Sequence, residues 1–96
     1  MGEAEKMYVR ALRGYETALG REGVKTYFPA LNTVQNLAVL YKQLGRVNEA
    51  KGMYSRALDG LEVVLGHSSK RYQDILTALT ALGGTDNNIA SPSVSL

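Results

Sequence analysis

The chain has 96 residues and a formal net charge of +2, with 45% hydrophobic and 21% charged residues. This length allows one domain at most, and this balance is typical of a folded protein rather than a disordered one. The eleven basic residues are scattered among nine acidic residues, so no basic stripe indicates binding to nucleic acid. The absence of cysteine excludes disulfides and thiolate metal sites.

Neither a targeting signal nor a membrane-spanning segment is recognisable. No apolar run approaches the roughly 20 residues that are needed to cross a bilayer. Charged residues occur within the first six positions, where a signal peptide would have an apolar stretch. We therefore expect a cytoplasmic protein that does not associate with a membrane.

An internal duplication dominates the sequence. Residues 3–20 read EAEKMYVRALRGYETALG, and residues 49–66 read EAKGMYSRALDGLEVVLG. At an offset of 46 residues the two segments align without a gap and are identical at eleven of eighteen positions. Such self-similarity at a fixed period indicates a repeat architecture.

Apolar residues at spacings of three and four predict a helix over residues 3–19 and a duplicate of it over residues 49–65. Gly20 and Gly66 follow the last apolar residue of each copy, where the end of a helix favours a positive φ. We expect Asn48 to cap the start of the second copy.

Each copy also has a glycine in the middle of its predicted helix, Gly14 in the first copy and Gly60 in the second. Glycine inside a helix costs about 1 kcal/mol relative to alanine. Close approach of a neighbouring backbone would explain both residues.

Two further helices are predicted, one over residues 30–44 with Pro29 at its first turn, and one over residues 69–82. Gly45 provides a tight turn between the first of these helices and the second copy of the duplicated segment. The residues expected on the buried stripes of these two helices are Leu31, Val34, Leu37, Ala38, Tyr41 and Leu44, and Tyr72, Ile75, Leu76, Leu79 and Leu82.

Large, small and aromatic residues follow one another in a fixed order from the second predicted helix into the third. The residues that carry this order are Leu37, Ala38, Tyr41, Gly45, Ala50, Tyr54 and Ala57. The pattern resembles the tetratricopeptide repeat, in which small residues let two helices of a hairpin approach closely while aromatic residues fill the remaining space. The resemblance implies an all-α fold in which about four helices form antiparallel hairpins, stacked as a short superhelix.

The subtype that the sequence most resembles has a longer period. The duplicated segment, together with LNTVQNLAVLYKQLGRVNEAKGMYSRAL, looks like the repeats of kinesin light chains and of fungal arrays that follow an NB-ARC-type ATPase module. Units of that type typically span 42 residues. The offset of 46 in this chain exceeds that period by four residues, which we place in a loop over residues 21–28.

The resemblance divides the chain into pieces of an array. Residues 1–82 form a partial array that contains a half repeat (3–19), a full repeat (30–65) and a second half repeat (69–82), and residues 83–96 are expected to form a flexible tail. Repeat arrays need neighbouring units or polar caps at their ends.

Two explanations of these half repeats remain open. The chain is either a piece of a longer array, or it pairs the uncapped faces of its end helices with another copy or a partner. In the second case we expect a charge on the outer face of the last helix, such as Leu79→Glu, to break the assembly.

For function, the resemblance implies a scaffold that binds a peptide or a helix of a partner protein along a concave face. That face is lined by the first helix of each repeat, and amide side chains suit it because they both donate and accept hydrogen bonds. The residues implied for partner binding are Asn32, Gln35, Asn36, Val39, Lys42, Gln43, Asp74 and Thr77. The alternative is a structural or oligomerising segment that pairs through its terminal helices.

No residue pattern indicates an enzyme. His67 is the only histidine, and with no cysteine and no acidic neighbour in the sequence it predicts neither a metal site nor a Ser-His-acid set. No glycine-rich phosphate loop occurs. We therefore expect no catalytic residue, no metal and no cofactor.

Overall fold

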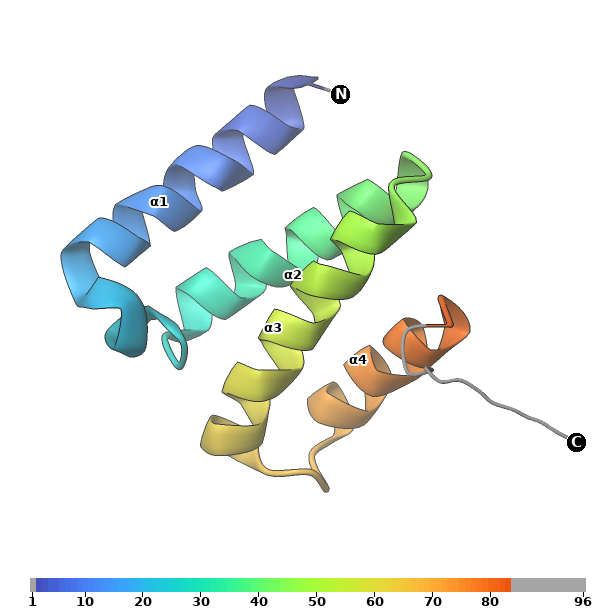
Figure 1. Cartoon of the computed structure of the whole chain (residues 1–96). Helices are drawn as coiled ribbons and strands as arrows, with labels where there is room; N and C mark the ends of the chain where they lie inside the picture. Colours follow the sequence, from blue (N-terminus) through green and yellow to red (C-terminus); the bar gives the residue numbers. More distant parts are fainter. Residues whose placement is uncertain (1, 84–96) are drawn as a thin grey trace, which may run out of the picture.

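The computed structural model describes residues 2–83, which form four α-helices and no strand. The helices are α1 (Gly2–Val24), α2 (Phe28–Gln43), α3 (Val47–Leu65) and α4 (Lys70–Ala81). They run up and down in a single row, in which α1 and α4 lie at the two ends (Figure 1). Each helix packs against the next one in the chain. The predicted all-α fold of antiparallel hairpins is confirmed, whereas the predicted tail lies outside the described residues from position 84 onward.

The starts of the helices partly agree with the sequence-based prediction. Pro29 lies in the first turn of α2, as expected. The prediction that Asn48 caps α3 is wrong: Arg46 occupies the N-cap position without a side-chain cap, and Asn48 is already inside the helix. At α4, Ser69 is the N-cap, and its hydroxyl accepts a hydrogen bond from the backbone N–H of Tyr72 at 3.0 Å.

Gly20 and Gly66 adopt the same conformation in the two copies of the duplicated segment. Their φ and ψ angles are 78° and 171° for Gly20, and 83° and 169° for Gly66. Residues with a side chain rarely adopt a positive φ, so the positions favour glycine. Gly66 therefore ends α3 as predicted, whereas Gly20 interrupts the helical geometry of α1 at the equivalent position without ending the helix.

The chain does not form a loop directly after Gly20. It makes one more helical turn up to Val24, which is buried. The predicted loop over residues 21–28 is thus wrong for its first half, because the four inserted residues form helix and bury an apolar side chain. Phe28 and Lys70, which begin α2 and α4, lie 42 positions apart, so the insertion affects only the spacing between α1 and α2.

The core lies mainly between α2 and α3. Ala38, Ala50 and Ala57 have no exposed surface, which lets the two helix backbones approach closely. The larger side chains that complete the core include Leu31, Val34, Leu37, Tyr41, Tyr54, Leu58 and Leu61. Four residues of the predicted stripes are only half-buried, namely Leu44, Tyr72, Leu76 and Leu82.

Leu79 belongs to this core and not to an outer face. It is 5% exposed, on the side of α4 that packs against α3, together with Ile75. The expectation that Leu79→Glu would probe an outer surface of α4 is therefore wrong, because the substitution would bury a charge between two helices.

A polar cluster joins α1 to the turn between α2 and α3. The Arg46 guanidinium donates hydrogen bonds to both carboxylate oxygens of Glu5 (3.0 and 3.1 Å) and of Glu49 (2.6 and 2.7 Å). The Tyr41 hydroxyl also donates to Glu5, at 3.0 Å, and the guanidinium lies 4.5 Å from the centre of the Tyr41 ring. These hydrogen bonds from Arg46 and Tyr41 lower the pKa of Glu5, and Arg46 likewise lowers the pKa of Glu49.

Gly60 lies where α3 meets the start of α2. A Cβ atom at this position would collide with the backbone carbonyl oxygen of Lys25 and would lie 2.5 Å from Cδ2 of Leu31. Gly14, the equivalent residue in α1, has no such neighbour within 4 Å. Close approach therefore explains Gly60 but not Gly14.

This difference predicts opposite effects of one substitution at two equivalent positions. Gly60→Ala should lower the free energy of unfolding by about 1–3 kcal/mol, because a backbone oxygen blocks the added methyl group. Gly14→Ala should raise it by up to about 1 kcal/mol, because the methyl group enters open space and alanine favours the helix. Urea unfolding followed by circular dichroism measures both, and effects of the same sign would contradict the packing described for Gly60.

A second prediction concerns acid. Because the pKa values of Glu5 and Glu49 lie below their ordinary value of 4.5, the folded chain binds fewer protons than the unfolded chain as the pH falls through that region. The free energy of unfolding should therefore fall as the pH is lowered below about 4.5. Glu5→Gln should be less stable at neutral pH and should lose less stability on acidification. Urea titrations across this range measure the slope, and an unchanged slope in Glu5→Gln would show that Glu5 is not responsible.

Candidate functional site

All eight residues predicted to bind a partner lie at the surface of the two first helices, α2 and α4. Only Gln35 is half-buried, and the other seven are exposed. We call this set the first-helix face; it comprises Asn32, Gln35, Asn36, Val39, Lys42 and Gln43 on α2, and Asp74 and Thr77 on α4.

Arg71 connects the two helices of the first-helix face. Its Nη2 atom donates hydrogen bonds to Oδ1 of Asn32 at 2.6 Å and to Oε1 of Gln35 at 3.0 Å. The guanidinium also lies 5.9 Å from the centre of the Phe28 ring, at the start of α2. An arginine of α4 thus holds two of the predicted amides in place, which leaves their NH₂ groups to donate to a ligand.

Sequence reasoning missed Arg71 as a site residue. Lys70 and Arg71 form the tightest basic pair in the chain, and this pair falls in the first turn of a predicted first helix. This placement is the feature of the sequence that could have identified Arg71 as a site residue. The contact itself joins residues that are 36 and 39 positions apart, so it depends on how α3 places α4 relative to α2.

Asp74 has an ion-pair partner of its own. Lys70 Nζ lies 3.2 Å from its carboxylate, one helical turn away, and both side chains are well exposed. Such an exposed pair contributes less than about 1 kcal/mol, so a ligand can displace it at small cost. Lys42, by contrast, has no acidic side chain within 4 Å among residues 2–83.

The rest of the first-helix face presents groups of several chemical kinds. Asn36 and Gln43 supply amides, Lys42 an ammonium group and Val39 an exposed apolar side chain. Amides pair with peptide backbone groups, and the ammonium group pairs with an acidic side chain or a terminal carboxylate. The arrangement suits binding and contains no nucleophile held by a base.

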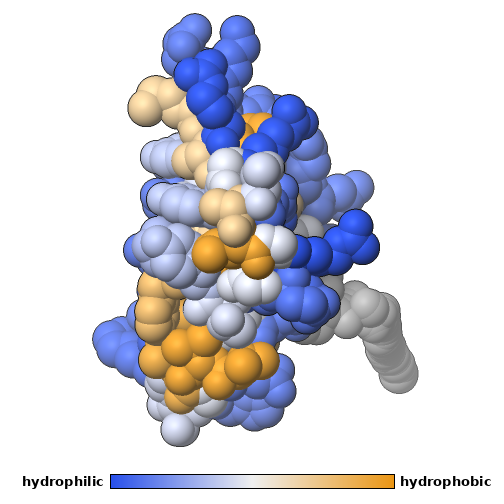
Figure 2. All heavy atoms as spheres, turned by 90° about the vertical axis from the view of Figure 1, so that its left-hand side faces the viewer, coloured by the Kyte–Doolittle hydropathy of each residue, from blue (hydrophilic) through white to orange (hydrophobic). Residues whose placement is uncertain are grey.

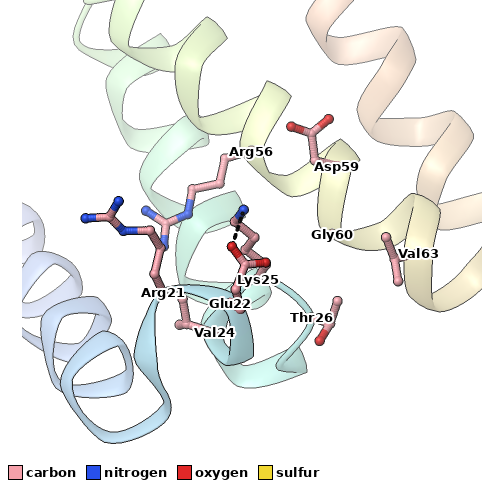
Figure 3. Close-up of a pocket in the computed structure, with 9 residues that line it drawn as sticks. All are labelled: Arg21, Glu22, Val24, Lys25, Thr26, Arg56, Asp59, Gly60 and Val63. Carbon is pink, nitrogen blue, oxygen red and sulfur yellow. Dashed lines mark hydrogen bonds and ion pairs between the residues drawn. The ribbon is translucent and has the colours of Figure 1, made fainter.

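A pocket of about 570 Å³ lies elsewhere, between the extra helical turn after Gly20 and α3. Figure 3 shows the charged side chains around it, where Lys25 pairs with Glu22 at 3.2 Å. None of the eight predicted residues lines this pocket. Its wall is built by the four inserted residues, whose position the sequence indicated but whose helical form it did not.

His67 has an acidic neighbour that the sequence did not suggest. Its Nε2 atom lies 3.0 Å from Oε2 of Glu62, and its ring centre lies 5.0 Å from that of Tyr72. The expectation of no acidic partner was wrong, because the end of α3 turns the chain back. Across the described part of the chain, no group of three His, Cys, Asp or Glu residues is placed to hold a metal ion.

None of the four described helices has the length and apolar character needed to cross a membrane.

Comparison with known proteins supports the resemblance noted in the sequence. Residues 31–69 match the family model of the tetratricopeptide repeat, which covers 39 of the 96 residues. Comparison with curated proteins and with solved structures gave no significant match. Tetratricopeptide repeats generally mediate interactions between proteins and are not catalytic. The matched residues include most of α2 and the whole of α3, so the hairpin that these two helices form is similar to a tetratricopeptide repeat.

Proposed function

We propose that the chain is a protein-interaction scaffold that binds a peptide or a helix of a partner protein on the first-helix face. The observation that carries the proposal is the bridge from Arg71 to the amides of Asn32 and Gln35, because it joins α2 and α4 into one continuous polar surface. A surface fixed before binding loses little conformational freedom when the ligand arrives. The mechanism is passive and requires neither cofactor nor catalysis.

The chemistry of the face favours an extended ligand with an acidic group. Asn36 and Lys42 lie on α2, the first helix of the matched repeat, and both are exposed. On this proposal Asn36 pairs with the ligand backbone and Lys42 with a carboxylate. Val39, 39% exposed, offers an apolar contact between them.

The proposal includes a domain organisation and a location. Residues 3–19, 30–65 and 69–82 act as a half repeat, a full repeat and a half repeat of one partial array over residues 1–82, in a cytoplasmic protein. The 42-residue step from the start of α2 to the start of α4 supports the kinesin-light-chain type, and hence the similarity to fungal arrays associated with NB-ARC modules.

The alternative function is a structural segment that assembles through its end helices. Met7 on α1 is 65% exposed, which favours assembly through this end helix. Equilibrium sedimentation over a range of concentrations separates the two functions. A monomer throughout supports the scaffold, whereas a concentration-dependent mass that Met7→Glu abolishes supports assembly through α1.

The scaffold predicts that two substitutions on α2 weaken ligand binding. Short unstructured peptides selected from a display library against the whole chain provide the probe, and fluorescence anisotropy measures their affinity. Lys42→Glu and Asn36→Ala should each weaken binding about tenfold, equivalent to about 1.4 kcal/mol, without changing helix content. Lys6→Glu on α1 makes the same change of charge away from the first-helix face and should leave the affinity unchanged. Selected peptides that are insensitive to both α2 substitutions would refute the proposal.

A further inference from the structure

The duplication allows α1 to be compared with α3 residue by residue. Ala57 of α3 has no exposed surface, whereas its equivalent Ala11 in α1 is exposed. Met53 is half-buried, whereas its equivalent Met7 is 65% exposed. Helix α3, which carries Ala57 and Met53, packs against α2, the first helix of its hairpin. Helix α1 has no corresponding helix packed over Ala11 and Met7 within residues 2–83.

Gly14 strengthens the comparison. Its equivalent Gly60 sits where Leu31 of α2 and the carbonyl oxygen of Lys25 leave no space for a Cβ atom. Gly14 has open space around it, although glycine inside an exposed helix costs about 1 kcal/mol relative to alanine. Nothing among the described residues accounts for a glycine at this position. A helix packed on α1 as α2 packs on α3 would account for it.

The charges of the two copies agree with the same arrangement. Glu49, at the start of α3, accepts two hydrogen bonds from Arg46, which follows the end of α2. Its equivalent Glu3, at the start of α1, is exposed and has no basic side chain within 4 Å among residues 2–83. A helix that docked antiparallel to α1 would bring a basic residue at its end beside Glu3.

We propose that α1 is a docking surface for an amphipathic helix of a partner protein, bound antiparallel to α1 in the way that α2 is bound to α3. The α1 docking face consists of Glu3, Met7, Ala11 and Gly14. The partner helix carries an apolar stripe with a leucine over Gly14, and a lysine or arginine just beyond its C-terminus. Figure 2 views the molecule from the side of α1 and shows residues of intermediate to high hydropathy, white to orange, running down it between hydrophilic margins in blue.

A second copy of this chain does not supply that helix. Helix α2 of each copy already packs between α1 and α3, so α4 is the remaining first helix. Counted from the first residues of α2 and α4, Leu31 and Ala38 correspond to Gln73 and Thr80, and both of the latter are exposed. The outward side of α4 therefore lacks the apolar stripe that α1 requires, which argues against a second copy as the occupant.

The chain itself provides the probe for this proposal. A labelled synthetic peptide of residues 27–46 contains α2 and Arg46, and its binding to the whole chain is measured by fluorescence anisotropy. We expect saturable binding, weakened at least tenfold by Gly14→Val and by less in Gly14→Ala, because each added atom lies under the docked helix. Gly52→Val is the matched control, since Gly52 is an exposed glycine inside α3 with nothing within 4 Å, and it should bind the peptide normally.

Charge reversal tests the orientation. Glu3→Arg should weaken binding of the natural peptide, and a peptide that carries Arg46→Glu should bind this variant better than it binds the unmodified chain. Restoration by the paired change is expected only if the end of the peptide lies beside Glu3. The two chains and the two peptides make four pairs, and equal affinities in all four pairs would overturn the antiparallel arrangement.

Three further outcomes would overturn the proposal. These are absence of peptide binding to the unmodified chain, binding that Gly14→Val leaves unchanged, and a dimer in sedimentation that Gly14→Val converts to monomer, which would assign the face to a second copy. The proposal and the scaffold function fail separately. Asn36→Ala and Lys42→Glu change the first-helix face alone and should leave binding of the α2 peptide as it was.

Discussion

The close approach of α2 and α3 is the constraint on which the rest of the structure depends. Alanines with no exposed surface and a glycine without room for a Cβ atom set the distance between the two backbones. At that distance the leucines of both helices fill the core, and the chain can turn through Gly45, at a positive φ of 77°. Arg46 follows this glycine, and its guanidinium reaches one carboxylate on α1 and one on α3. A wider separation would lose the core and the polar cluster together.

The contacts that α1 and α4 make with the hairpin of α2 and α3 combine apolar packing with polar contacts from arginines. Helix α1 buries Leu12 against its neighbour, and two arginines of the full hairpin bind its carboxylates: Arg46 holds Glu5, and Arg56 holds Glu16 at 2.8 Å. At the other end, Arg71 of α4 holds two amides of α2. Apolar packing thus joins all four helices, and arginines that span 36 to 41 residues of sequence add polar contacts between the hairpin of α2 and α3 and its neighbours. Bidentate geometry makes the Arg46 contact more specific than an ordinary surface ion pair.

Much of this fold follows from the sequence, and the exceptions have one physical origin. Apolar spacing and the duplication predict four helices, the buried side of α2 and the glycine-ended second helices, because these depend on neighbours three or four residues away. Helical periodicity does not say which neighbouring element covers a given side. That is why the Arg71 bridge was missed, and why the sequence did not show that the buried side of Leu79 faces α3. The eight proposed binding residues were placed on accessible first helices, but which of them α4 holds in place became visible only from the packing.

The extra helical turn after Gly20 shows where repeats that share a core can diverge. Both junctions begin with a glycine of the same conformation, and both lead into a first helix in the same register, yet one is four residues longer. The burial of Val24 stabilises the added turn, and residues of this turn line one side of the pocket beside α3. The junction between units is therefore a position at which length varies without disturbing the stack. The recess beside α3 can therefore change with the length of this junction, while the helices that carry the first-helix face stay unchanged.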